Sequence, residues 1–150
     1  MRFHGKELRK GRTSLGGHAY LLTAVTQGRT PVFRDWSTAC LMARLLDQMG
    51  SSGEVTSLAW VLMPDHFHWL LQLNTGTLST AMQRLKSISA VAINRHIGQS
   101  QRVWQKGFHD RALRHEENLQ AVARYIVANP VRANLCRKVG DYPFWNAVWL

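Results

Sequence analysis

The strongest constraint on the fold is a pair of apolar runs, residues 57–63 and 66–73, with only Pro64 and Asp65 between them. Both runs are rich in residues that favour β-strands, and a proline followed by an aspartate between such runs is typical of a tight turn. The sequence therefore predicts an antiparallel hairpin here, and we interpret the other elements around it.

The remaining elements lie on both sides of this hairpin in the sequence. We expect strands at residues 18–26 and within residues 103–114, and helices at residues 35–49, at residues 78–97 and from about residue 116 to residue 129. Apolar residues at helical spacing indicate the helices, and Pro130 is expected to stop the last one. Strands interleaved with helices around one hairpin predict an α+β sandwich with a mainly antiparallel, four-stranded sheet.

The length of 150 residues favours a single domain that covers residues 1–150. Residues 1–12 form a basic N-terminal arm, and residues 135–150 form a C-terminal tail that we expect to pack on the domain through Trp145 and Trp149. Two cysteines are too few for a disulfide scaffold, so we expect reduced thiols. Apolar runs are shorter than the roughly 20 residues that span a bilayer, so we expect no membrane partner.

The charge balance points to a polyanionic partner. The 19 Lys and Arg residues exceed the 9 Asp and Glu residues by 10. An apolar fraction of 45% with six tryptophans excludes a disordered basic tail. Such a charge can serve solubility alone, but in a compact domain we favour binding of nucleic acid.

The second run of the hairpin has two chemically different faces. Because side chains alternate along a strand, Phe67, Trp69 and Leu71 share one face, which suits a core. His66 and His68 share the other face, where two imidazoles can bind one metal ion. By itself, a His-x-His pattern in a strand also fits a structural or a surface role.

The last helix carries a second candidate pair. Leu119, Val122 and Ile126 form its apolar stripe. Tyr125 and Asn129 lie four residues apart, one turn above the other, on the flank of that stripe. Tyr125 is thus placed at the edge of the core, although a tyrosine there can simply pack, and an asparagine before Pro130 can simply end the helix.

Together, the two patterns resemble a known family. His66-Phe67-His68, preceded by Met63-Pro64-Asp65, is similar to the HUH motif of two histidines around a hydrophobic residue. Residues 125–133, YIVANPVRA, resemble the signature of the REP-associated tyrosine transposases, which are bacterial relatives of the single-tyrosine HUH transposases of insertion sequences. Shorter matches lie at residues 104–108 and 142–145. Asn134 departs from the family, which usually has glycine after this signature.

The resemblance implies a fold and an activity. It implies a ferredoxin-like sheet covered by helices on one face. It also implies an enzyme that cleaves and rejoins single-stranded DNA next to hairpin elements, with Tyr125 as the nucleophile and a 5′-phosphotyrosine intermediate. His66, His68 and Asn129 would bind the divalent metal ion, Mg²⁺ or Mn²⁺.

The resemblance further suggests single-stranded or hairpin DNA as the partner, a monomer or homodimer, and a cytoplasmic, nucleoid-associated location. Two alternatives stay open: a hairpin DNA-binding protein without cleavage activity, and a relaxase-like HUH nickase. The candidate phosphate contacts are the basic residues of the two later helices and their flanks, namely Arg84, Lys86, Arg95, Arg111, Arg114, Arg124 and Arg132.

Two polar groups near these motifs are given other roles. Asp65 can orient a histidine, but we favour a role in the turn. His109 and Asp110 are interpreted as a solvent-facing pair on the fourth strand, outside the catalytic set.

Overall fold

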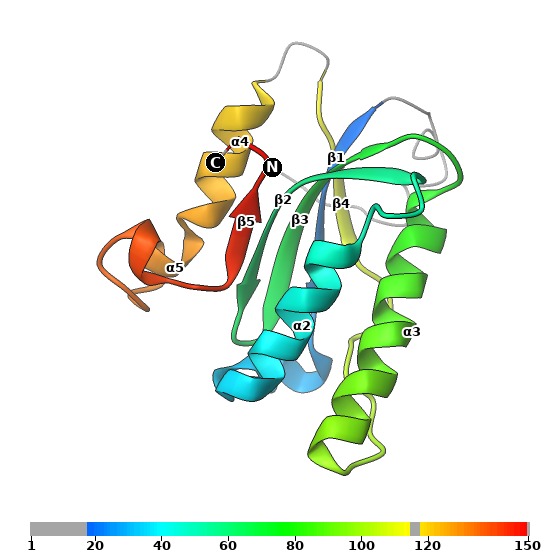
Figure 1. Cartoon of the computed structure of the whole chain (residues 1–150), viewed down its shortest axis with the longest axis vertical. Helices are drawn as coiled ribbons and strands as arrows, with labels where there is room; N and C mark the ends of the chain where they lie inside the picture. The colour runs from blue at the N-terminus through cyan, green and yellow to red at the C-terminus, as the bar shows by residue number, and fades with distance from the viewer. Residues whose placement is uncertain (1–17, 115–117, 150) are drawn as a thin grey trace.

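The computed structural model describes residues 18–114 and 118–149. In this part the main elements follow in the order β1 (Ala19–Val25), α2 (Trp36–Gln48), β2 (Val55–Met63), β3 (His66–Leu73), α3 (Leu78–Ile97), β4 (His109–Ala112), α4 (Leu119–Val127), α5 (Asn129–Arg132) and β5 (Trp145–Ala147) (Figure 1). Short 3-10 turns are η1 (Gln27–Arg29), η2 (Val32–Arg34) and η3 (Val139–Asp141). The basic arm at residues 1–12 lies outside the described residues.

The strands form one antiparallel sheet in the order β4-β1-β3-β2-β5. The predicted hairpin is confirmed, with Met63 paired to His66 at its closed end. The sequence of elements from β1 to β4 is the βαββαβ pattern of ferredoxin-like folds. The α+β class is therefore confirmed, and β3 lies in the middle of the sheet.

The expected number of four strands was wrong, because a fifth strand comes from the C-terminal tail. β5 pairs with β2 through Ala59 and Ala147. Its three residues are too few to show a period of two, so the sequence pattern did not reveal it. Tyr142 also holds the tail, since its hydroxyl donates to the carbonyl of Leu62 at 2.5 Å. Of the two tryptophans expected to anchor the tail, Trp145 packs against the core on this side of the sheet, whereas Trp149 is 38% exposed.

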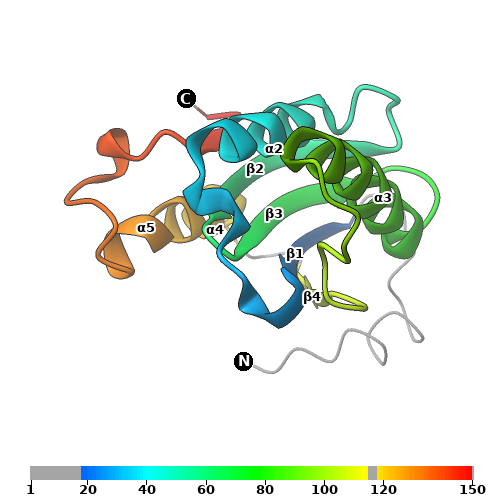
Figure 2. The same cartoon turned by 90° about the horizontal axis from the view of Figure 1, so that it is seen from below.

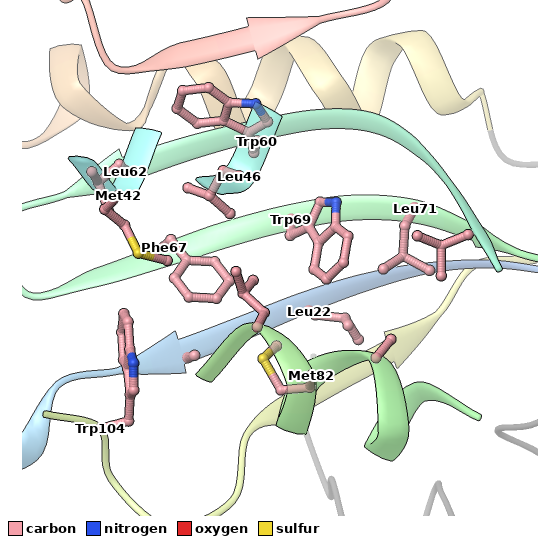
Figure 3. Packing of buried hydrophobic residues seen from close by; sticks show 14 of the residues in the cluster. Leu22, Met42, Leu46, Trp60, Leu62, Phe67, Trp69, Leu71, Met82 and Trp104 are labelled. Atoms are coloured by element: carbon pink, nitrogen blue, oxygen red, sulfur yellow. The ribbon is translucent and has the colours of Figure 1, made fainter. Parts of the chain in front are cut away.

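The larger core lies between the sheet and the helices α2 and α3, which run side by side over one face (Figure 2). Phe67 and Trp69 of β3 are fully buried there, and they pack with Met42 and Leu46 of α2 and Met82 of α3 (Figure 3). The predicted aromatic face of β3 is therefore a core face.

The opposite face of the sheet is covered as well, which corrects the expectation of helices on one face only. Ala123 and Ile126 of α4 pack on Val61 and Leu70 of the two central strands. Leu70 follows His66 and His68 on the same face of β3, so this face has an apolar position after the two histidines. α4 packs at this apolar position.

The fourth strand is shorter than the predicted segment. β4 covers only His109–Ala112, whereas Trp104 makes an isolated bridge to Thr26. The Trp104 indole is buried and donates a hydrogen bond to Ser89 of α3 at 2.9 Å. This bond fixes the segment before β4 to the helix, so the segment is ordered without being a strand.

Pro130 does not end the helical region, contrary to the expectation. α4 begins after its N-cap Asn118 and ends at Val127, and Pro130 then occupies the first turn of the separate helix α5. A proline is tolerated there because an N–H at this position has no partner within the helix. Glu116 and Glu117, expected at the start of the last helix, lie outside the described residues.

Asn134 ends α5 in the left-handed conformation, with φ of 60°. Its N–H donates to Val131 at 3.0 Å, and the N–H of Leu135 donates to Pro130 at 2.8 Å. These two bonds form a Schellman motif, in which glycine is the common residue and asparagine the next best. The departure from glycine therefore preserves the turn.

Replacing Asn134 tests this turn. Asn134→Ala is expected to lower the free energy of unfolding by about 1 kcal/mol, because a β-carbon without a polar group disfavours positive φ. Asn134→Gly is the matched control and should leave stability near the wild-type value. Urea unfolding measures both, and an alanine variant as stable as the wild type would contradict the assignment.

No helix within the described residues is both long enough and apolar enough to cross a membrane.

Candidate active site

A cavity of about 700 Å³ lies between α4 and the face of the sheet that carries the histidines. Residues from β1, β3, β4, α4 and the start of α5 line it: Leu21, Thr23, His68, His109, Arg111, Ala121, Val122, Tyr125, Ile126 and Asn129. The fold thus brings His68 of the hairpin together with Tyr125 and Asn129 of the distant helical region.

The two histidines lie next to each other as the strand alternation predicted. Their ring centroids are 5.0 Å apart, with the rings at 80°. Nδ1 of His66 is 2.6 Å from Oδ1 of Asp65, and Nδ1 of His68 is 2.7 Å from Oγ1 of Thr23. Because both Nδ1 atoms are engaged, Nε2 of each ring is the nitrogen suited to binding a metal.

His68 is held in the neutral form. Burial lowers its pKa to about 3, and the charges of His66 and Arg132 act in the same direction. A neutral imidazole keeps the lone pair that a metal ion requires. At neutral pH, the protein therefore presents this ring as a ligand without first removing a proton.

Asp65 serves the histidine and not only the turn, which corrects the interpretation we favoured. Its second carboxylate oxygen accepts from Nη1 of Arg29 at 3.1 Å. Partial burial acts to raise the pKa of Asp65, but hydrogen bonds and charge from His66 and Arg29 outweigh it, and this pKa lies below its ordinary value. The carboxylate is thus kept ionised as a hydrogen-bond acceptor for His66.

Arg29 reaches Asp65 from an unusual backbone conformation. It has φ of 53°, directly after Gly28 in η1. The buried hydroxyl of Thr26 donates to the carbonyl of Asp65 at 3.1 Å, and its N–H donates to the same carbonyl at 2.9 Å. These bonds dock η1 on the hairpin turn and place the guanidinium of Arg29 beside the carboxylate.

Tyr125 is more exposed to solvent than Tyr20, which lies in the core. It is 64% exposed, whereas Tyr20 is 1% exposed within the core. Tyr142 is half-buried and donates its hydroxyl to Leu62. Of the three tyrosines, Tyr125 is thus the one on the cavity and open to a substrate.

Arg132 connects the nucleophile candidate to the metal-ligand candidate. Its Nη2 donates to the amide oxygen of Asn129 and, at 2.7 Å, to the carbonyl of Tyr125. Its guanidinium carbon lies 3.9 Å from the centre of the Tyr125 ring. This arginine, predicted from the sequence as a DNA contact, therefore lies within the site.

The other predicted DNA contacts do not lie on one face of the sheet. Arg111 lines the cavity, and Arg114 and Arg124 are exposed on β4's flank and on α4. α3, which carries Arg84, Lys86 and Arg95, packs on the opposite face. Arg84 there is paired with Glu54 at 2.6 Å, and Lys86 donates to the carbonyls of Gln105, at 2.7 Å, and Gly107.

Two residues that line the cavity were not among the site residues predicted from the sequence: Thr23 was not noticed, and His109 was left out of the catalytic set. Thr23 is paired in the sheet with both His68 and His109, so these three side chains form a row across β4, β1 and β3. His109 lines the cavity and is exposed, which agrees with the solvent-facing role we expected, whereas Asp110 is fully buried, which contradicts that role. The positions of Thr23 and His109 follow from the pairing of the strands, which the sequence pattern does not show.

The residues at this end of the cavity fit a divalent ion. Among the described residues, no group of three or more His, Cys, Asp and Glu side chains is placed to hold a metal. The available donors are therefore the two imidazoles, whose Nδ1 atoms are fixed, with the amide oxygen of Asn129. This set leaves coordination positions for water and phosphate, and imidazole nitrogen suits Mn²⁺ better than Mg²⁺.

Comparison with known proteins gives a consistent result. The family model "Transposase IS200 like" matches residues 14–129. The REP-associated tyrosine transposase of Escherichia coli (strain K12) is 28% identical over 88 residues, which are 57% of this chain and 50% of the relative. The chain thus spans about half the length of this curated relative.

Two solved structures share the fold. A REP-associated tyrosine transposase bound to a REP hairpin is 21% identical, with a TM-score of 0.68, and the match covers 89% of this chain and 79% of the other. A transposase-like protein from Deinococcus radiodurans is 22% identical, with a TM-score of 0.55, and the match covers 79% and 95%.

The role of Asp65 can be tested through metal affinity. Asp65→Asn removes the charged acceptor of His66 and is expected to weaken Mn²⁺ binding by about tenfold or more. Asp141→Asn, the same change at an exposed position in η3, is the control and should leave the affinity unchanged. Electron paramagnetic resonance of free Mn²⁺ measures both, and equal affinities in the two variants would refute the role.

Proposed function

The chain belongs to the IS200-like transposase family, and we propose that it cleaves and rejoins single-stranded DNA next to hairpin elements with Tyr125 as the nucleophile. One observation carries the proposal. An exposed tyrosine lines the same cavity as His68 and Asn129, beside a pair of histidines whose Nδ1 atoms are both held by neighbours.

The hairpin substrate is supported by a relative and by charge. The structural relative with a TM-score of 0.68 was solved with a REP hairpin. The net charge of +10 gives this chain a sequence-independent attraction to phosphates. Arg111 and Arg132 place part of that charge at the cavity.

The phenol oxygen of Tyr125 would attack the phosphorus of the scissile phosphodiester. As the new oxygen–phosphorus bond forms, the phenol releases its proton to solvent, the bond to the 3′ oxygen breaks, and that oxygen takes up a proton from solvent. The product is a 5′-phosphotyrosine and a free 3′-hydroxyl. Because the covalent link preserves a phosphodiester, a second 3′-hydroxyl can reverse the step onto another strand without ATP.

His66, His68 and Asn129 would hold the divalent ion, Mg²⁺ or Mn²⁺. When bound, this ion withdraws charge from the scissile phosphate and orients it. The protein's own part is to fix both imidazoles through Thr23 and Asp65. α4 places the tyrosine on the same cavity as His68.

The nucleophile is tested by a tyrosine pair. Wild-type protein with Mn²⁺ and a stem-loop oligonucleotide with single-stranded flanks should form a covalent adduct that survives denaturing electrophoresis. Tyr125→Phe should form none, because it lacks the attacking oxygen. Tyr142→Phe is the matched control and should keep the adduct, at a stability cost of about 1 kcal/mol.

An adduct formed by Tyr125→Phe would overturn the assignment of the nucleophile. Tight hairpin binding by wild-type protein, with no adduct under Mg²⁺ or Mn²⁺, would favour the DNA-binding protein without cleavage activity.

Metal removal tests the histidine pair. A chelator should abolish adduct formation by the wild type, and added Mn²⁺ should restore it. His68→Gln should resist this rescue because one fixed ligand is lost. His96→Gln, an exposed change on α3, should behave as the wild type. Adduct formation at an undiminished rate in the chelator would contradict a metal-dependent step.

A further inference from the structure

Arg132 makes contacts that a simple surface cation would not make. One guanidinium bonds the amide oxygen of Asn129, bonds the carbonyl of Tyr125 and stacks on the Tyr125 ring. The two short helices α4 and α5 meet at Ala128, which brings these three residues together. The side chain therefore links the nucleophile to the amide that would serve the metal.

We propose that Arg132 and the divalent ion compete for the amide oxygen of Asn129, and that metal binding releases the guanidinium to a phosphate of the DNA. This inference rests on the metal site of the proposed function. It makes Arg132 a positioning residue with two partners, Asn129 in the metal-free protein and DNA in the loaded protein.

The competition follows from charge and from donor chemistry. A guanidinium has five N–H donors and no acceptor, and it keeps its positive charge. A divalent cation at Oδ1 of Asn129 would lie in close contact with that charge and be strongly repelled. The two cations cannot share this oxygen at low cost, so binding of one displaces the other.

The site offers the released side chain a new partner. Arg132 is exposed, and it lies against the ring whose oxygen would attack the phosphate. Its charge also contributes to the lowered pKa of His68, so it acts on the same end of the cavity. A guanidinium fork matches two phosphate oxygens, which makes the reacting strand its natural partner.

This exchange predicts that metal and DNA help each other to bind. If metal raises the affinity for DNA by a given factor, DNA must raise the affinity for metal by the same factor. Because the contact is to phosphate, it does not depend on base sequence. A plain single strand is therefore a sufficient probe.

The first measurement compares Mn²⁺ binding without DNA. Arg132→Met keeps the length of the side chain and removes its donors, so it should bind Mn²⁺ about tenfold tighter than the wild type. Arg137→Met, an equal loss of charge at an exposed position of the tail, is the control and should stay near the wild-type value. Electron paramagnetic resonance of free Mn²⁺ gives the affinities.

The second measurement gives the coupling, in Tyr125→Phe protein so that no cleavage occurs. Mg²⁺ should raise the affinity for a fluorescent oligothymidylate by about fivefold or more. Adding Arg132→Met to this protein should remove most of the gain. Fluorescence anisotropy reports binding, and circular dichroism confirms that each variant is folded.

The third measurement needs no substitution. In wild-type protein, Mg²⁺ should shift the NMR signals of the Asn129 amide and the Arg132 guanidinium together, at one metal concentration. Unchanged Arg132 signals while Asn129 shifts would overturn the inference, as would Mn²⁺ affinity that Arg132→Met leaves unchanged or weakens. Absence of Mn²⁺ binding by the wild type itself would instead remove the metal site on which the proposed function rests.

Discussion

The alternation of side chains along β3 is the constraint on which the rest of the molecule depends. Phe67 and Trp69 point to the face covered by α2 and α3, and this places His66 and His68 on the opposite face. A shift of one residue in the pairing of β3 would exchange the two faces and bury the imidazoles among apolar side chains. The pairing of β3 with both β1 and β2 prevents that shift, so the core and the site are fixed by the same hydrogen bonds.

The face of β3 that carries the histidines is buried at one position and only partly covered at the histidines. Leu70, farther along β3, is fully buried under α4, whereas His66 and His68 are only partly covered. α4 therefore has two tasks. Ile126 anchors it to the sheet, and the neighbouring Tyr125 remains exposed at the cavity. A helix lying directly over the histidines would have closed the site.

Local patterns predicted much of this arrangement. The bounds of β3 and α3 agree with the expected residues, and α2 differs by one residue at each end, because periodicity and caps are local signals. The candidate residues His68, Tyr125 and Asn129 do line one cavity.

What the sequence did not reveal depends on pairing between distant segments, as in β5 and in the row that Thr23 forms with His68 and His109. The helical turn at Pro130 was missed because proline disfavours a helix interior but not a helix start.

Identification of the modified tyrosine tests the central claim most directly. A covalent protein–DNA adduct would be digested with nuclease and protease, and mass spectrometry would locate the remaining nucleotide. The account predicts a nucleotide joined through its 5′-phosphate to Tyr125. A nucleotide on Tyr142, on a residue that is not a tyrosine, or joined through a 3′-phosphate would contradict it.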